Sequence, residues 1–175
     1  MAIKRRVCSS CSLGATKLHR VFAVGAIPSR IVFFTDGPNR DEDRRGRLLV
    51  GDEATFFFEM VVDAAKMAEL PIPAYCVIPV VFCRPVDHCQ GPTRPPTAEE
   101  VLKCAPEVDA FLHKAEPVYA VFFGSAAERF YGKRFKSKAK IIEPAFLMKQ
   151  GGKRSAFYLS NVRRLSDVFK KVEEM

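Results

Sequence analysis

The stretch Ile31-Val-Phe-Phe-Thr-Asp-Gly-Pro-Asn39 places four apolar residues directly before a turn sequence. A short apolar run of this kind is typical of a strand buried on both faces of a sheet. Asp-Gly-Pro-Asn is typical of the turn that ends such a strand. Two more apolar runs, residues 75–82 and 118–123, predict further buried strands, although the first of them contains Pro79.

Helical patterns separate these runs. Residues 53–70 carry apolar side chains at helical spacing, and the prolines at 71 and 73 end that helix. Thr97-Ala-Glu-Glu100 predicts the capping box of a second helix, which runs to about residue 114. Residues 125–131 and 162–172 predict two more helices, residues 40–47 a charged loop, and residues 141–142 a short strand.

Alternating strands and helices favour an α/β fold with a parallel sheet covered by helices on both faces. In such sheets ligands bind at the carboxyl ends of the strands. We therefore expect the functional residues in three segments, which are residues 35–39, residues 83–96 and the region around Glu143.

The composition limits the class of protein. With 175 residues, of which 48% are hydrophobic and 27% charged, residues 1–175 are expected to form a single domain with its own core. No apolar run is long enough to cross a membrane, so no membrane partner is expected. The basic N-terminus lacks the apolar stretch of a secretory signal. The six cysteines are therefore expected to be reduced thiols or metal ligands in the cytoplasm.

The positive charge is concentrated in one segment. The chain carries a formal charge of +8, whereas residues 129–164 contain eleven Lys and Arg against one acid, Glu143. Clustered cations neutralise phosphates and release counterions, so a nucleic acid is the expected partner, with a solvated surface loop as the alternative.

The cysteines suggest a metal centre. Cys8-Ser-Ser-Cys11 is a CxxC pair, and Cys83 and Cys104 flank a proline-rich loop. Four thiolates can hold either a [4Fe-4S] cluster or a structural zinc ion. Cys76 lies in an apolar run and is expected in the core, whereas Cys89 and the adjacent His88 are alternative ligands. On residue chemistry alone zinc is favoured, because structural zinc is the commoner of the two.

The order of motifs resembles the iron–sulfur uracil-DNA glycosylases of family 4 and the related domain of some phage-type DNA polymerases. That family opens with CxxCxL, matched by Cys8 to Leu13, and continues with GExPGxxEDxxGRPFVG, which aligns without a gap with residues 35–51. The family's KCRP, PTxEE and following Cys are matched by Phe82-Cys-Arg-Pro85, Pro96-Thr-Ala-Glu-Glu100 and Cys104, with a longer loop between them. Ile142-Glu-Pro-Ala-Phe-Leu147 resembles the late HPAxLL motif.

The resemblance implies a three-layer αβα sandwich of the uracil-DNA glycosylase type, with a small parallel sheet. It implies the chemistry of a hydrolase in DNA repair, which flips a damaged base out of DNA and cleaves its glycosidic bond. It also changes the expected cofactor from zinc to a structural [4Fe-4S] cluster, with zinc as the alternative. The implied ligands are Cys8, Cys11, Cys83 and Cys104.

The groups that would handle uracil differ from the family pattern. The family's carboxylate falls on Asp36, next to Thr35 in place of a glycine, and Pro38 is shared. The stacking phenylalanine falls on Leu49, the uracil-reading asparagine on Pro79, and the late histidine on Glu143. Excision needs a donor to the anion that develops on the base, and an ionised Glu143 would oppose that anion.

Two functional hypotheses follow. In the first, the chain is a DNA-binding iron–sulfur module of DNA replication or repair that has lost uracil excision. It would act on single- or double-stranded DNA at the nucleoid, with a DNA polymerase or another replication protein as partner. In the alternative, it is an active glycosylase with changed base specificity, in which Asp36 positions water and Glu143 shares the acid–base work. The residues expected to contact DNA are Arg47, Lys136, Lys138, Lys140, Lys149, Lys153 and Arg154.

Overall fold

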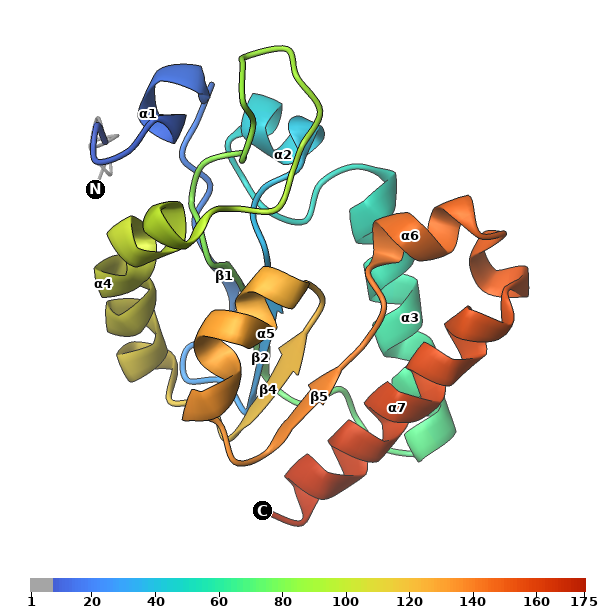
Figure 1. The fold of residues 1–175 in the computed structure, drawn as a ribbon. Coiled ribbons are helices and arrows are strands. Elements are labelled where there is room, and N and C mark those ends of the chain that lie inside the picture. The colour runs from blue at the N-terminus through green and yellow to red at the C-terminus, as the bar shows by residue number, and fades with distance from the viewer. Residues whose placement is uncertain (1–7) are drawn as a thin grey trace.

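The computed structural model describes residues 8–175 and shows a five-stranded sheet between two layers of helices (Figure 1). The strand order is β1-β3-β2-β4-β5. The parallel strands are β2 (Ile31–Thr35), β3 (Tyr75–Pro79), β4 (Tyr119–Phe122) and β5 (Lys138–Lys140). The short edge strand β1 (Val24–Gly25) pairs with β3 in the antiparallel direction. This arrangement confirms the predicted α/β fold.

Alternate residues of the central strands face two separate cores. Ile31 and Phe33 of β2 pack into one apolar cluster, whereas Val32 and Phe34 pack into the other. All four side chains are fully buried, which explains why the strand reads as an uninterrupted apolar run.

The helices form the two outer layers. On one side of the sheet lie α3 (Asp52–Ala68), α6 (Pro144–Lys149) and α7 (Ala156–Glu173). On the other lie α1 (Leu13–Thr16), α4 (Ala98–Ala115) and α5 (Ser125–Tyr131). The remaining elements are α2 (Arg40–Arg45) and two single-turn 3₁₀ segments, η1 (Gly132–Arg134) and η2 (Gly152–Arg154).

Some local expectations were wrong. Residues 40–45 form the helix α2 instead of a loop, because the Asn39 side chain accepts a hydrogen bond from the Glu42 N–H and Gly46 ends the helix at a φ of 69°. The late strand comprises residues 138–140 instead of 141–142, and α7 begins six residues earlier than predicted. The strand predicted over residues 75–82 ends at Pro79.

Among residues 8–175, no helix has the length and apolar character needed to cross a membrane.

Candidate functional site

A cavity of about 570 Å³ opens at the carboxyl ends of β2 and β4. This is the end of the sheet where parallel folds bind ligands. Its walls come from the turn after β2, from α3, from the loop before α4 and from the start of α6. The lining includes Thr35, Asp36, Asn39, Arg40, Glu42, Leu49, Glu53, Phe57, Pro92, Thr93, Arg94, Pro95, Phe123, Glu143 and Lys149.

The carboxylate of Asp36 is bound to the first turn of α5. Its Oδ1 accepts a hydrogen bond from the N–H of Ala127 at 2.7 Å, and its Oδ2 accepts one from the N–H of Ala126 at 3.4 Å. A Cβ at Gly124 would overlap this carboxyl group, so the close approach requires glycine there. Asp36 therefore satisfies otherwise unpaired N–H groups of a helix start.

Glu143 lies across the same cavity, directly before the first residue of α6. Within residues 8–175, its carboxylate has no hydrogen-bond or ion-pair partner. Partial desolvation raises its pKa, and the nearby charges of Asp36 and Glu53 raise it further. Because the residue remains exposed, solvent screening limits these effects.

The Glu42–Asp43 pair after the turn has a structural role. The buried Glu42 carboxylate accepts hydrogen bonds from the N–H groups of Asn39 (3.0 Å) and Leu49 (2.9 Å). Burial raises the pKa of Glu42 despite these two bonds. The buried Asp43 accepts from the N–H groups of Leu18 and His19, which ties the N-terminal segment to α2.

Leu49 has a left-handed backbone conformation, with a φ of 56°. Such conformations cost energy for a residue with a side chain, and the Glu42 hydrogen bond holds this one in place. Its side chain forms part of the cavity wall.

The predicted base-pocket residues divide into two groups. Thr35 and Leu49 line the cavity together with Asp36 and Glu143. Pro38 and Pro79 are buried and are not among the lining residues. Pro79 pairs with Thr35 across the β2–β3 ladder. The Thr35 hydroxyl is buried without a hydrogen-bond partner in the described part of the chain.

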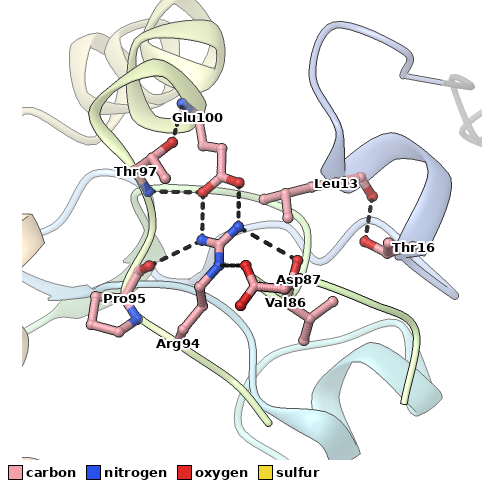
Figure 2. Close-up of polar contacts among 8 residues, drawn as sticks. All are labelled: Leu13, Thr16, Val86, Asp87, Arg94, Pro95, Thr97 and Glu100. Atoms are coloured by element: carbon pink, nitrogen blue, oxygen red, sulfur yellow. Dashed lines mark hydrogen bonds and ion pairs between the residues drawn. The ribbon is translucent and has the colours of Figure 1, made fainter. Parts of the chain in front are cut away.

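The long loop between the matched motifs Phe82-Cys-Arg-Pro85 and Pro96-Thr-Ala-Glu-Glu100 forms a wall of the cavity. Its central residue is Arg94, which binds both carboxylate oxygens of Glu100 at 2.8 and 3.0 Å (Figure 2). Arg94 Nε also donates to Asp87, and Glu100 in turn accepts from the Thr97 N–H (Figure 2). The buried Arg84 donates to the Gly91 carbonyl at 2.6 Å. This network fixes Pro92 to Pro95 beside the cavity.

Two site residues were not expected from the sequence. Phe123 and Phe57 line the cavity and pack edge to face, with ring centroids 5.6 Å apart. Asn39 and Arg94 lie in the expected segments 35–39 and 83–96, although neither was singled out there. Asn39 lines the cavity and donates to Glu53 at 3.0 Å. Arg94 has a recognisable signal, since it precedes the capping box that supplies its partner Glu100.

The four matched cysteines come from three segments that meet on the α4 side of the sheet. Cys8 and Cys11 precede α1, Cys83 follows β3, and Cys104 lies on α4. Burial raises the pKa of the Cys83 thiol to about 12, and the neighbouring Cys104 and Cys8 thiols act in the same direction. Cys83 and Cys104 belong to the same buried cluster, and the partly buried Cys11 packs against that cluster.

The segment that carries Cys8 and Cys11 is held tightly. Lys17 Nζ donates to the carbonyl oxygens of Cys8 (3.1 Å) and Gly14 (2.7 Å). A Cβ at Gly14 would collide with the Cys8 carbonyl. Over residues 8–175, no three His, Cys, Asp or Glu side chains are arranged to hold a single metal ion. Four thiolates from three segments form a donor set of the type that holds a [4Fe-4S] cluster.

The basic residues do not form one surface. Lys149 lines the main cavity, whereas Lys138 and Lys140 line a smaller one of about 340 Å³ between β5 and α7. Lys153 is paired with Glu59 and Asp63 of α3. The side chains of Arg47, Lys136 and Arg154 are exposed.

Residues 22–169 match the model of the uracil DNA glycosylase superfamily. The chain is 33% identical over 123 residues to a protein of Archaeoglobus fulgidus, covering 70% of this chain and 57% of that protein. It is 30% identical over 124 residues to one of Thermotoga maritima (71% and 60% covered) and 24% identical over 183 residues to one of Sulfurisphaera tokodaii (96% and 80% covered). All three are named Type-4 uracil-DNA glycosylase. The aligned part spans less than two thirds of the first two relatives.

Proposed function

The chain belongs to the uracil-DNA glycosylase superfamily, with a family 4-like domain, and from this membership we propose that it binds DNA but no longer excises uracil. DNA is the substrate that the family implies. The proposal rests on one observation, which is that two carboxylates, Asp36 and Glu143, line the cavity that would receive the flipped base.

Uracil leaves its sugar as an anion, and a catalyst must donate to that anion as it forms. Glu143 lies where the family pattern has a histidine, and an ionised carboxylate there repels the leaving group. No asparagine side chain reaches the base from β3, because Pro79 occupies the matched position and is buried in the sheet. The two leaving-group contacts of the family pattern are therefore missing at the positions matched by Pro79 and Glu143.

We also propose that Cys8, Cys11, Cys83 and Cys104 hold a [4Fe-4S] cluster, with zinc as the alternative occupant. The support is the packing of Cys83, Cys104 and Cys11 in one cluster and the close approach of Gly14 to the Cys8 carbonyl. Such a cluster would be a structural cross-link that joins the N-terminal segment, β3 and α4. Cys76 is buried in β3 and Cys89 is exposed, so neither belongs to this group.

DNA would approach along the mouth of the cavity, where Lys149 is exposed. Each cation that neutralises a phosphate adds to the salt dependence of binding. Lys149→Ala is therefore expected to weaken binding to every sequence and to lower the slope of log K against log salt by about one. Lys103→Ala on the exposed face of α4 is the matched control.

The test combines excision and binding on anaerobically purified protein. Single- and double-stranded oligonucleotides with and without uracil are incubated with the protein and then cleaved at abasic sites, while anisotropy measures binding at two salt concentrations. We expect salt-sensitive binding and no strand cleavage. Uracil excision that is lost in Asp36→Asn would overturn the proposal.

A glycosylase of changed base specificity is the second candidate. It is favoured by the cavity itself, whose volume lies within the range of small-molecule sites. A carboxylate has about four acceptor positions, and α5 occupies two of those on Asp36. The remaining two are free to orient water, so excision of another base from the same panel of oligonucleotides would support this candidate.

An accessory role beside a DNA polymerase or another replication protein is part of the first proposal. It follows from retained DNA binding without excision. Co-purification of a polymerase from the native host with the tagged chain, after nuclease treatment, tests it.

A further inference from the structure

We propose that the cavity receives a nucleobase that carries an exocyclic amino group, with cytosine as the simplest case, and that Glu143 is the residue that reads this group. The inference rests on the proposed function only in placing a flipped base in this cavity. It concerns which base fits, and not whether the chain binds DNA or cleaves it.

Apart from Lys149, the main side-chain donors that line the cavity are engaged within the protein. The Arg94 guanidinium donates to Glu100, Asp87 and two backbone carbonyls. The Asn39 amide donates to Glu53, and Arg40 reaches the Gln90 carbonyl at 3.3 Å. A ligand whose edge consists of carbonyl oxygens therefore finds few donors free to bind it.

The unoccupied groups are mainly acceptors. The Glu143 carboxylate has no partner among residues 8–175, and the buried Thr35 hydroxyl has none either. The Glu53 and Asp36 carboxylates add negative charge to the same cavity. This imbalance favours a ligand that brings N–H donors.

The pyrimidine bases differ in the group that they carry at position 4 of the ring. Thymine and uracil present a carbonyl oxygen at position 4, whereas cytosine presents an amino group there, which Glu and Asp accept from. Uracil would place its carbonyl oxygen against a carboxylate, and the two would repel. Cytosine would instead donate to Glu143.

The other lining residues provide an apolar surface for a base and a cation for its phosphate. Phe123 and Phe57 are fixed in the core and supply an apolar floor that needs no rearrangement. Leu49 lies in the same lining, and Lys149 provides a cation for the phosphate. A base stacked on the apolar surface would extend its polar edge toward the carboxylates.

The test is calorimetric titration of the full chain with two mononucleotides, dCMP and dUMP. We expect dCMP to bind about tenfold more tightly, the discrimination typical of one well-placed hydrogen-bonding group. In Glu143→Ala this preference is expected to disappear through weaker dCMP binding. Glu143→Gln is expected to keep part of it, because the amide oxygen still accepts from the amino group.

The controls separate this inference from the proposed function. Glu99→Gln on α4 is exposed, outside the cavity, and is expected to leave both affinities unchanged. Equal affinities, tighter dUMP binding, or no binding of either nucleotide would overturn the inference while DNA binding stands. A dCMP preference that depends on Glu143, in a protein that does not bind DNA, would overturn the proposed function alone.

Discussion

The Asp36 carboxylate reaches the first turn of α5 because residue 124 is glycine. Asp36 Oδ1 lies 2.7 Å from the Ala127 nitrogen, and a Cβ at Gly124 would occupy the space of that carboxyl group. The turn after β2 and the turn after β4 are therefore joined by a hydrogen bond beside the cavity. A side chain on any residue other than glycine at position 124 would block this bond.

Gly124→Ala is expected to push Asp36 away from α5 and to lower the free energy of unfolding by about 1–3 kcal/mol, as overpacking does in well-packed regions. Urea denaturation measures the change. Gly132→Ala is the matched control, because its Cβ would make only an ordinary contact with Glu128 and its backbone is helical. Equal losses in both variants would contradict the account.

Asp36→Ala is expected to cost about 1–2 kcal/mol of stability through loss of the acceptor at the helix start, with a smaller loss in Asp36→Asn. The amide of asparagine keeps one acceptor oxygen, which explains the order. Thermal unfolding of the two variants checks it. An unchanged melting temperature in Asp36→Ala would show that the bonds to α5 contribute nothing to stability.

Thr35→Val is expected to leave stability unchanged or to raise it by up to about 1 kcal/mol. The Thr35 hydroxyl is buried without a partner in the described chain, so the isosteric valine removes a desolvation cost and no bond. Urea denaturation is again the measurement. A loss of stability would mean that the hydroxyl binds an ordered water molecule.

Glu100→Gln is expected to destabilise the protein by about 3 kcal/mol near neutral pH, since the Glu100 side chain is only 4% exposed and its loss of charge leaves Arg94 with the exposed Asp87 as its remaining carboxylate partner. Burial by itself would raise the pKa of Glu100, but the bonds from Arg94 and Thr97 outweigh burial and lower it below 4.5. A carboxyl group with a lowered pKa contributes stability above its unfolded pKa and loses it as the pH falls through the folded one.

The difference between the native chain and Glu100→Gln should therefore be largest near neutral pH and should shrink as the pH falls below about 4. Denaturation curves across that range measure it. Glu99→Gln, the exposed neighbour, is expected to change stability by less than about 0.5 kcal/mol. A difference that is independent of pH would rule out the ion pair as its cause.

Cys83→Ser and Cys104→Ser are each expected to remove most of the iron and acid-labile sulfide from anaerobically purified protein. Cys89→Ser, in the exposed loop, should retain both. Elemental analysis and visible absorption provide the measurement. Zinc without sulfide in the native chain would replace the proposed cluster with the alternative ion.

The central strands were predictable because their burial is complete. Phe33 and Phe34 face opposite cores, so every position of β2 must be apolar and the pattern needs no tertiary information. Asp36 lies in the turn directly after β2, so the prediction of this strand also placed Asp36 at the carboxyl end of the sheet, where ligands bind.

The helix α2 was not predictable from apolar periodicity, since its residues Arg40–Arg45 are all charged. Its ends are set by local signals, the Asn39–Glu42 capping box and Gly46, which an analysis of apolar periodicity does not detect. Asp43 adds bonds to the distant N–H groups of Leu18 and His19. The strand β5 was misplaced because Lys138 and Lys140 are polar and lie at the sheet edge, so its position depends on pairing with β4.

The candidate site was predicted in part for a similar reason. Asp36, Leu49 and Glu143 were found because they occupy positions within the matched motifs, and the structure places all three in one cavity. Phe123 and Arg94 join them only through the packing of the sheet and of the long loop. The grouping of the four cysteines likewise came from the family resemblance, because residue spacing alone left the choice of ligands open.

The loop that walls the cavity runs between Cys83 and Cys104, two of the proposed metal ligands, and Arg94 secures it to α4 through Glu100. A metal centre held by Cys83 and Cys104 would therefore couple its own occupancy to the shape of the cavity through this loop. Such coupling is reciprocal, so a ligand that prefers the metal-loaded shape would strengthen metal retention by the same factor. Nucleotide bound in the cavity would then slow the loss of the proposed metal to a chelator, and loss of that metal would weaken nucleotide binding without any change in the residues that contact it.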